Sequence, residues 1–281
     1  SILGKHKIGL FLRANSNTYE SISSSRIKFQ FYDLLRPLDD LVTDLISNSP
    51  DILIAPPSIL RHLADEEIGM KFRKIVSVAE VLTPLDRKII EQHFQCIVHQ
   101  FYTSTEGEIA ATCEYGTLHL NEETMVIQKE WIDEEKGIFH PIISDFKRKT
   151  QPIIRYRQND ILVMQKENCP CGDARQAIAE IIGRQDDIFE LKTISGKIEM
   201  VVPDLIRRAT LQMSEHIDSY FVEQISREEI NVMIRPKLEK LDMSGFELLW
   251  ASKNIIPPKL NFPDYQYEPS VKKMRRIRRR F

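Results

Sequence analysis

Apolar runs alternate with amphipathic segments in a repeating order through the first hundred residues, and this order constrains the fold most strongly. Short apolar runs bounded by polar or proline residues are typical of buried strands, and we predict them at 7–12, 51–55, 74–78 and 96–101. Apolar side chains spaced three to four residues apart predict helices at 34–47, 58–64 and 83–94. This alternation indicates a parallel sheet with flanking helices on its faces.

The pattern changes after residue 108. Shorter runs with Gly, Asn and Pro between them favour a small antiparallel, barrel-like section, which we place at about 108–182. Beyond Asp187 a helix near 203–215 and strands at 220–226 and 230–234 predict a smaller α+β unit. The expected fold class is therefore α/β, with a large domain at 1–187 and a small C-terminal domain at 188–281.

Composition excludes several classes of protein. The chain has 281 residues, 42% of them hydrophobic, and its 39 basic and 41 acidic residues nearly cancel, so no overall field favours nucleic acid or an anionic membrane. No apolar run approaches the roughly 18 residues of a spanning helix. We expect a cytoplasmic protein without a membrane partner. Seven of the nine residues at 272–280 are Lys or Arg, which is typical of a solvated tail.

Three cysteines and a histidine have the spacing of a metal site. Five residues with a glycine turn separate Cys113 from His119, and Cys169 and Cys171 flank a proline some fifty residues later. Two short pairs of thiolate and imidazole ligands match structural Zn²⁺. The alternative is a set of ordinary buried or exposed side chains. Cys96, on a predicted strand, is assigned to the core.

A hydroxyl-rich loop follows the strand predicted at 96–101. Parallel sheets bind ligands at the carboxyl ends of their strands, where this loop lies. The hydroxyls of Thr103, Ser104 and Thr105 can bind phosphate oxygens, and the Glu106 carboxylate is an oxygen ligand suited to Mg²⁺. Taken alone, such a Thr- and Ser-rich loop is more often an ordinary turn than a phosphate site. Further along, Asp160 follows a basic run and can accept hydrogen bonds from ribose hydroxyls.

Four segments in order resemble the motifs of the adenylate-forming acyl ligases, specifically the phenylacetate-CoA-ligase-like branch with its deazaflavin coenzyme synthetase relatives. These segments are 77–80 (Ser-Val-Ala-Glu), 102–106 (Tyr-Thr-Ser-Thr-Glu), 154–160 and 183–187 (Gly-Arg-Gln-Asp-Asp). They are similar, respectively, to the adenine loop, the aromatic-to-Thr-Glu motif, the Arg-Tyr-x-x-x-Asp motif and the hinge of that family. The resemblance covers nearly the whole chain.

The resemblance also implies roles for single residues. Thr105 would contact the α-phosphate, Glu106 would hold Mg²⁺, and Lys273 would stabilise the pentacovalent phosphorus, although Lys272 stands where the family has Gly. The remaining ATP or AMP contacts fall on Ala79, Glu80, Tyr102, Asp160 and Arg184. Asp186 or Asp187 would be the hinge about which the small domain rotates. The implied zinc ligands are Cys113, His119, Cys169 and Cys171.

The implied reaction is activation of a small carboxylic acid by ATP and Mg²⁺, giving an acyl-AMP that is passed to a thiol such as CoA or a carrier protein. The family's Gly-rich phosphate loop has no counterpart in this sequence, so we expect a C-terminal fragment that is inactive by itself. The alternative is a catalytically silent, zinc-stabilised module that binds a partner. Nucleic acid ranks last, because no aromatic residues are interleaved with the basic run.

Overall fold

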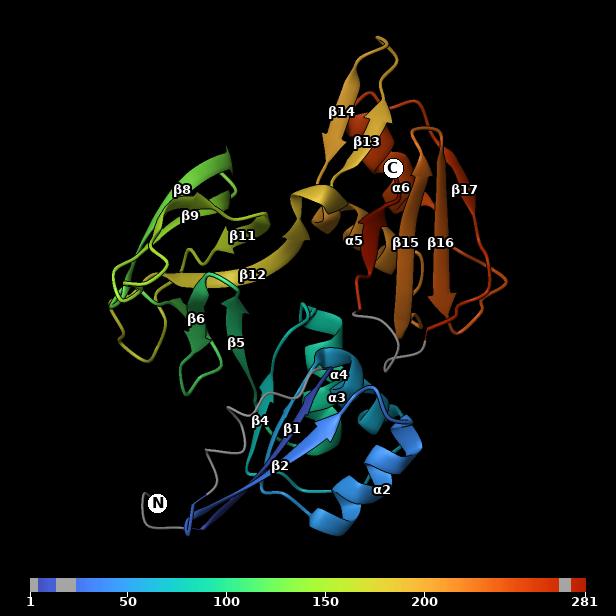
Figure 1. The fold of residues 1–281 in the computed structure, drawn as a ribbon. Helices are drawn as coiled ribbons and strands as arrows, with labels where there is room; N and C mark the ends of the chain where they lie inside the picture. Colours follow the sequence, from blue (N-terminus) through green and yellow to red (C-terminus); the bar gives the residue numbers. More distant parts are fainter. Residues whose placement is uncertain (1–4, 14–23, 268–273) are drawn as a thin grey trace.

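The structure is a computed structural model that describes residues 5–13, 24–267 and 274–281 (Figure 1). Lys273, which the sequence assigns to catalysis, lies outside the described residues. Twelve strands form one large sheet, in the order β10-β9-β11-β12-β7-β6-β5-β4-β3-β1-β2 with β8 paired to β9. One half of this sheet is parallel and the other half is antiparallel, as the change of sequence pattern predicts.

The parallel half contains β1 to β5, and helices α2, α3 and α4 lie beside it (Figure 1). Its elements are β1 (His6–Leu12), β2 (Ile27–Asp33), α2 (Leu38–Asn48), β3 (Ile52–Ala55), α3 (Pro57–Asp65), β4 (Lys74–Ser77), α4 (Pro84–Phe94) and β5 (Val98–Ser104). Fully buried side chains from both helices and strands, including Phe11, Leu45, Leu53, Ile59 and Ile90, make one core. Burial of this apolar surface holds the helices against the sheet.

Local sequence fixes where the helices begin. The Thr83 hydroxyl accepts a hydrogen bond from the Asp86 N–H at 3.2 Å, and Pro84 occupies the first turn of α4. The helix predicted from residue 34 instead begins at Leu38. Asp33 accepts a hydrogen bond from the Leu35 N–H at 3.0 Å and forms a turn, and Pro37 disfavours helical backbone before it.

The antiparallel half curves away from α4 and has its own core (Figure 1). Its strands are β6 (Gly107–Thr112), β7 (Leu118–Leu120), β8 (Met125–Asp133), β9 (Ile138–Asp145), β10 (Ile153–Arg157), β11 (Asp160–Met164) and β12 (Ala177–Arg184). Their inward side chains, such as Ile109, Leu120, Phe139 and Leu162, are fully buried. The expected fold class, a parallel sheet with flanking helices and an antiparallel section, is confirmed.

A separate core lies in the described residues from 188 onward, which we call the C-terminal unit. Its elements, after the 3₁₀ turn η1 (Gln185–Asp187), are β13 (Phe189–Lys192), β14 (Ile198–Val201), α5 (Pro203–Gln212), β15 (Ser219–Ser226), β16 (Glu229–Arg235), α6 (Ser244–Ser252), β17 (Lys259–Asn261) and β18 (Ile277–Arg279). Strands β17-β16-β15-β18 form a four-stranded sheet, and β13 and β14 form a hairpin. Helices α5 and α6 supply the rest of this α+β architecture.

The basic run at 272–280 is not a solvated tail where the structure describes it, so that prediction is wrong. Residues 277–279 form β18, which pairs in parallel with β15. Arg278 and Arg280 form ion pairs with Glu223, and Arg279 pairs with Glu190. The sequence did not reveal these ion pairs, because both glutamates lie more than fifty residues upstream of the arginines. Without known partners, a run of like charges is expected to be solvated.

In the part of the chain that the structure covers, no helix combines the length and the apolar character needed to cross a membrane.

Candidate functional site

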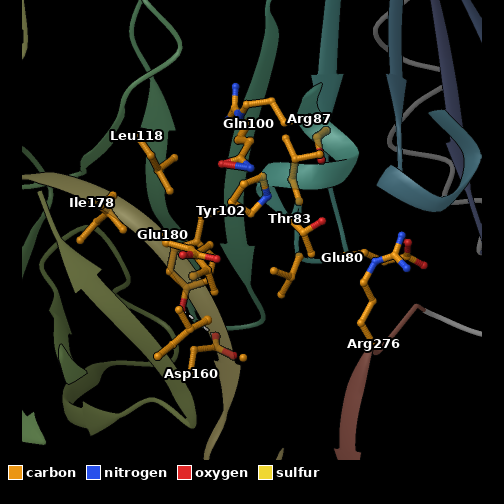
Figure 2. A pocket seen from close by; sticks show the side chains of 18 of the residues that line it. Glu80, Thr83, Arg87, Gln100, Tyr102, Leu118, Asp160, Ile178, Glu180 and Arg276 are labelled. Carbon is orange, nitrogen blue, oxygen red and sulfur yellow. Dashed lines mark hydrogen bonds between the residues drawn. The ribbon is translucent and has the colours of Figure 1, made fainter. Parts of the chain in front are cut away.

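A cavity of about 640 Å³ lies between the edge formed by β4, β5 and β12 and the C-terminal unit. This volume is in the range of small-molecule sites. Figure 2 shows Glu80, Thr83, Tyr102, Asp160 and Arg276 around it, although they come from widely separated elements. The cavity is therefore built by the fold and by no single stretch of sequence.

Five of the residues predicted to bind nucleotide line this one cavity. They are Ala79, Glu80, Tyr102, Asp160 and Arg184. The sequence separates the first of them from the last by about a hundred residues. The loop after β4, the strand β5 and the start of β11 bring them together with the end of β12.

The loop after β4 holds a buried carboxylate. Ala79 has a left-handed backbone (φ 67°), which turns the chain directly before Glu80. The Glu80 carboxylate accepts hydrogen bonds from the N–H of Ser58 at 3.2 Å and the N–H of Met274 at 2.9 Å, and lies 3.6 Å from Arg13. Burial raises the pKa of Glu80, and these hydrogen bonds oppose that rise.

Tyr102, Asp160 and Arg184 form a connected group on the cavity wall. The Tyr102 hydroxyl donates to Asp160 Oδ2 at 2.6 Å, and Arg184 Nε lies 3.3 Å from Asp160 Oδ1. Burial, and then the neighbouring carboxylate, raises the pKa of Tyr102 well above its ordinary value, so the hydroxyl remains a donor. Both carboxylate oxygens of Asp160 therefore have partners, one of which is the half-exposed Arg184.

Of the residues predicted to contact phosphate or Mg²⁺, Thr103 on β5 lines the cavity, whereas Thr105 and Glu106 lie in the tight turn between β5 and β6, outside the cavity lining. Thr105 is exposed there. The Glu106 carboxylate accepts a hydrogen bond from Gln158 at 3.3 Å, and its backbone N–H donates to Ser104 at 3.3 Å. Partial burial raises the pKa of Glu106. Hydrogen bonds to its carboxylate, of which that of Ser104 has the largest effect, lower the pKa by more, so it stays below its usual value. The carboxylate is thus an anion at neutral pH.

Gly107 ends this turn, and we expect Gly107→Ala to destabilise the protein by about 1–3 kcal/mol. Its φ of +150° is strained for any residue with a Cβ, and the added Cβ would come within 2.5 Å of Met125 Cε, the end of a flexible side chain that would have to shift within the antiparallel core. Thermal unfolding of both proteins measures the effect. Gly69→Ala is the matched control, because a Cβ there meets nothing within 4 Å. Equal losses in both variants would contradict the steric argument.

The two candidate hinge residues have different environments in the turn η1. Asp186 is exposed and accepts a hydrogen bond from Asn159 at 2.8 Å. Asp187 is buried, lines the cavity and pairs with Arg275 of the C-terminal unit. Burial raises the pKa of Asp187, and the positive charge of Arg275 opposes that rise. The turn thus touches both the cavity and the chain terminus.

The predicted metal ligands converge. The ligand atoms of Cys113, His119, Cys169 and Cys171 all lie within 4.8 Å of one another. Cys113 Sγ is 3.7 Å from Cys169 Sγ, and Cys171 Sγ is 3.4 Å from His119 Nε2. Zn–S and Zn–N bonds of about 2.0–2.3 Å in a tetrahedron require separations of this order, so the donor set fits Zn²⁺.

The histidine of this cluster is also held in a suitable orientation. His119 Nδ1 lies 3.0 Å from the carbonyl oxygen of Arg175, so that nitrogen can donate its proton and leave Nε2 facing the thiols. The Thr117 hydroxyl lowers the pKa of Cys169. At Cys171 a hydrogen bond from the Asp173 N–H lowers the pKa, but burial and the neighbouring thiols outweigh it and raise the pKa, so without metal the thiolate is favoured at Cys169. The hydrogen bond between His119 on β7 and Arg175 in the segment before β12 therefore joins the two parts of the chain that carry the ligands.

Other cavity residues carry no recognisable sequence signal. Arg87 on α4, Gln100 on β5 and Glu180 on β12 line the cavity, as does Arg207 on α5. Arg207 pairs with Glu180 across the cavity wall. No motif marks them, because only the packing of the C-terminal unit against β12 and α4 brings them to one place.

The fold is that of acyl-CoA ligases that form adenylates. The chain aligns with 2-hydroxyisobutyryl-CoA ligase in its postadenylation state with a TM-score of 0.70 and 17% identity, over 97% of this chain and 65% of that one. A benzoate CoA ligase from Burkholderia xenovorans LB400 aligns at 0.61, with 14% identity over 97% and 60%. The anthranilate CoA ligase AuaEII, solved with anthranoyl-AMP, aligns at 0.61, with 12% identity over 96% and 58%.

Among curated proteins, the chain is 29% identical to the protein CapK of Staphylococcus aureus over 196 residues, which is 64% of this chain and 43% of CapK. No family model matches the chain. The chain thus spans less than half of CapK and less than two thirds of each of these three ligases.

Proposed function

We propose that this chain is the C-terminal part of an enzyme that uses ATP and Mg²⁺ to adenylate a small carboxylic acid. The observation that carries the proposal is the cavity: five residues from four separate motifs line it together, in the fold of acyl-CoA ligases. Thr105, Glu106 and Lys273 keep their predicted roles at the phosphates on the strength of the sequence resemblance.

The contacts of Asp160 suit a ribose site. A carboxylate can accept hydrogen bonds from two vicinal hydroxyls, and Asp160 is already oriented by the donor Tyr102 at 2.6 Å. Arg184 is more than half exposed, so its 3.3 Å contact with Asp160 can be exchanged for a ligand contact. We assign these residues to the ribose, and Ala79 and Glu80 to the adenine side.

The chemistry needs charge neutralisation and no general base. The acid is already a carboxylate at neutral pH, and its oxygen attacks the α-phosphorus while the bond to pyrophosphate breaks. Mg²⁺ held by the ionised Glu106 would offset the negative charge of the phosphates. The Thr105 hydroxyl, exposed in the adjacent turn, would donate to an α-phosphate oxygen.

Lys273 would stabilise the pentacovalent phosphorus. Its sequence neighbour Met274 donates its N–H to Glu80 of the adenine loop, and this contact supports the assignment. The acyl-AMP would then be attacked by the sulfur of CoA or of a carrier protein, with release of AMP. The names of the similar structures, which are CoA ligases, support CoA as the acceptor class.

We assign Zn²⁺ to the cluster of Cys113, His119, Cys169 and Cys171 as a structural ion. Four protein ligands leave no open coordination position, so this ion would take no part in adenylation. The proposal also divides the chain into a large domain at 1–187 and a small domain at 188–281. The small domain would rotate about Asp186 or Asp187. The core of the C-terminal unit is separate from the two cores that precede η1, and this separation supports the division.

A second candidate function is a silent module that binds a partner. It is favoured by the contacts that already occupy the nucleotide-site acids: Glu80 accepts from two backbone N–H groups, and Asp160 is paired on both oxygens. The two candidates differ in one measurable property, which is turnover of ATP.

The test is release of pyrophosphate from ATP and Mg²⁺ by the full-length protein across a panel of carboxylic acids. Glu106→Gln is expected to lower the acid-dependent rate by about a hundredfold, as loss of one transition-state contact does. Glu108→Gln is the control, because Glu108 lies two residues away and is exposed on β6. Release that requires an acid and is lost only in Glu106→Gln supports adenylation, whereas a folded protein that neither binds nor cleaves ATP supports the silent module.

A further inference from the structure

Three consecutive residues near the chain terminus are each held by a buried acid. These residues, 274–276, precede β18 and line the cavity. Their partners are Glu80 in the loop after β4, Asp187 in η1 and Asp86 in the first turn of α4, whose side chains are 0%, 6% and 0% exposed. Buried acids are costly unless they are paired, so this concentration of them requires an explanation.

The pair of Arg276 and Asp86 is the most deeply buried contact of the three. Arg276 Nε donates to Asp86 Oδ2 at 3.0 Å, and Arg276 Nη2 donates to Asp86 Oδ1. The third nitrogen, Nη1, donates to the Ser219 hydroxyl at 3.0 Å and the Tyr220 carbonyl at 3.1 Å. Arg276 is thus tied to its own unit by β15 and to α4 by a bidentate ion pair.

Asp86 is oriented in advance to receive this guanidinium. The Thr83 hydroxyl donates to Asp86 Oδ2 at 2.7 Å, and Asp86 lies in the first turn of α4, where the helix dipole stabilises an anion. Arg61 on α3 approaches Asp86 Oδ1 at 3.5 Å and donates to the carbonyl oxygen of Asp218 at 2.8 Å. Asp86, Thr83 and Arg61 therefore form a pre-oriented polar binding site for a side chain of the C-terminal unit.

Two further ion pairs, both made by Arg235, lie at the same interface as the pair of Arg276 and Asp86. Arg235 on β16 donates to Asp65 on α3 at 2.7 Å and to Asp218 in its own unit at 2.7 Å. These side chains are partly exposed, so their contribution is smaller than that of the buried pair. Together the contacts form a polar interface between the face of α3 and α4 and the C-terminal unit.

We propose that Arg276 and Asp86 form a latch that docks the C-terminal unit on the face of α3 and α4 and closes the cavity. Arg276 is in this scheme a positioning residue: its docking sets where Met274 and Arg275 meet Glu80 and Asp187. The two charges are paired when the units are docked and hydrated when they separate. Removing Arg276 takes the bidentate partner from Asp86 and leaves it the 3.5 Å contact with Arg61 and the Thr83 hydroxyl. The remaining buried charge is then under-compensated in the docked state, so such a substitution shifts the equilibrium toward separation.

The latch goes beyond adenylation and does not depend on it. Among the interface residues that the structure describes, the one predicted substrate contact is the Glu80 carboxylate, and the side-chain hydrogen bonds of Arg276 run to Asp86, Ser219 and Tyr220. A test that contains no nucleotide and no acid therefore separates failure of the latch from failure of the proposed function.

Met274 provides a probe of docking. It is 8% exposed and lines the cavity at the interface, whereas Met213 and Met125 are 2% and 3% exposed inside the cores of the C-terminal unit and the antiparallel half. Oxidation of methionine by peroxide follows exposure and can be located by mass spectrometry. Met274 reports separation of the units, and the other two report unfolding.

We expect Arg276→Gln and Asp86→Asn, each in the full chain, to raise the oxidation rate of Met274 at least fivefold while Met213 and Met125 stay protected. The radius of gyration from small-angle X-ray scattering should rise in the same variants. Arg227→Gln is the control, because Arg227 pairs with Glu190 inside the C-terminal unit. It should leave all three rates unchanged.

The double variant Asp86→Asn with Arg276→Gln removes both charges and should oxidise more slowly at Met274 than either single variant. Unchanged Met274 oxidation in both single variants would overturn the latch. Equal oxidation of Met274, Met213 and Met125 would overturn it as well, because the pair would then be part of a folding core and would not control docking.

Discussion

Cys171→Ser is expected to reduce the zinc content of the purified protein from about one ion per chain to near zero and to lower its unfolding temperature. Structural zinc supplies about 10–16 kcal/mol to small zinc-finger peptides. The strands of this protein hold part of the site without metal, so we expect a smaller loss of at least about 3 kcal/mol. For a chain of this size that loss corresponds to a fall of roughly 6–12 °C.

The size of this effect follows from the position of the ligands. Cys169 and Cys171 lie in the segment between β11 and β12, which has no regular secondary structure of its own. Cys113 and His119 flank the turn between β6 and β7, and residues 115–117 of that turn line the cavity. Loss of the metal would therefore free both loops and loosen one wall of the cavity, so ligand binding should weaken together with stability.

The measurement is metal analysis by mass spectrometry together with thermal unfolding, with and without a chelator. Cys96→Ser is the matched control, because Cys96 is outside the cluster, packs at the edge of the parallel core and has backbone carbonyl oxygens as its hydrogen-bond partners. It should retain its zinc and most of its stability. A parent protein that contains no zinc after purification, and whose unfolding temperature is insensitive to a chelator, would contradict the assignment.

The parallel half of the fold could be predicted because its signals are local. The apolar run before Ala55 and the Thr83-Pro84 start of α4 are within one residue of the observed boundaries. Periodicity and capping report on neighbouring residues, and a single sequence contains all of that information. The Cys3His cluster could be predicted for the same reason, since each pair of candidate metal ligands is short and only the meeting of the two pairs needed the fold.

The cavity was predictable only in part. Motif residues such as Tyr102 and Asp160 were found from their resemblance to a family, and they do meet in the structure. Glu180 and Arg207 carry no such signal, because their role depends on how α5 packs against β12. Contacts between distant segments depend on tertiary packing, which periodicity does not describe.

The basic run at 272–280 is a second case in which tertiary contacts could not be predicted from the sequence. It also gives the second prediction with a large expected effect. Arg276→Gln is expected to lower the free energy of unfolding by about 3–5 kcal/mol, whereas Arg280→Gln should change it by about 0–1 kcal/mol. In the sequence, both arginines belong to the same basic run, and nothing distinguishes their expected exposure. In the structure the Arg276 side chain is 5% exposed and bound to Asp86, while Arg280 is half exposed beside Glu223.

Urea unfolding of both variants, followed by circular dichroism, makes the comparison. If the latch opens in Arg276→Gln, Asp86 becomes hydrated, so the loss cannot exceed the free energy of separating the units. A loss near 3–5 kcal/mol then means that docking contributes at least that much to stability. A small loss together with an expanded radius of gyration means that the units separate easily, whereas equal small losses in both variants with no expansion would show that the run behaves as a tail.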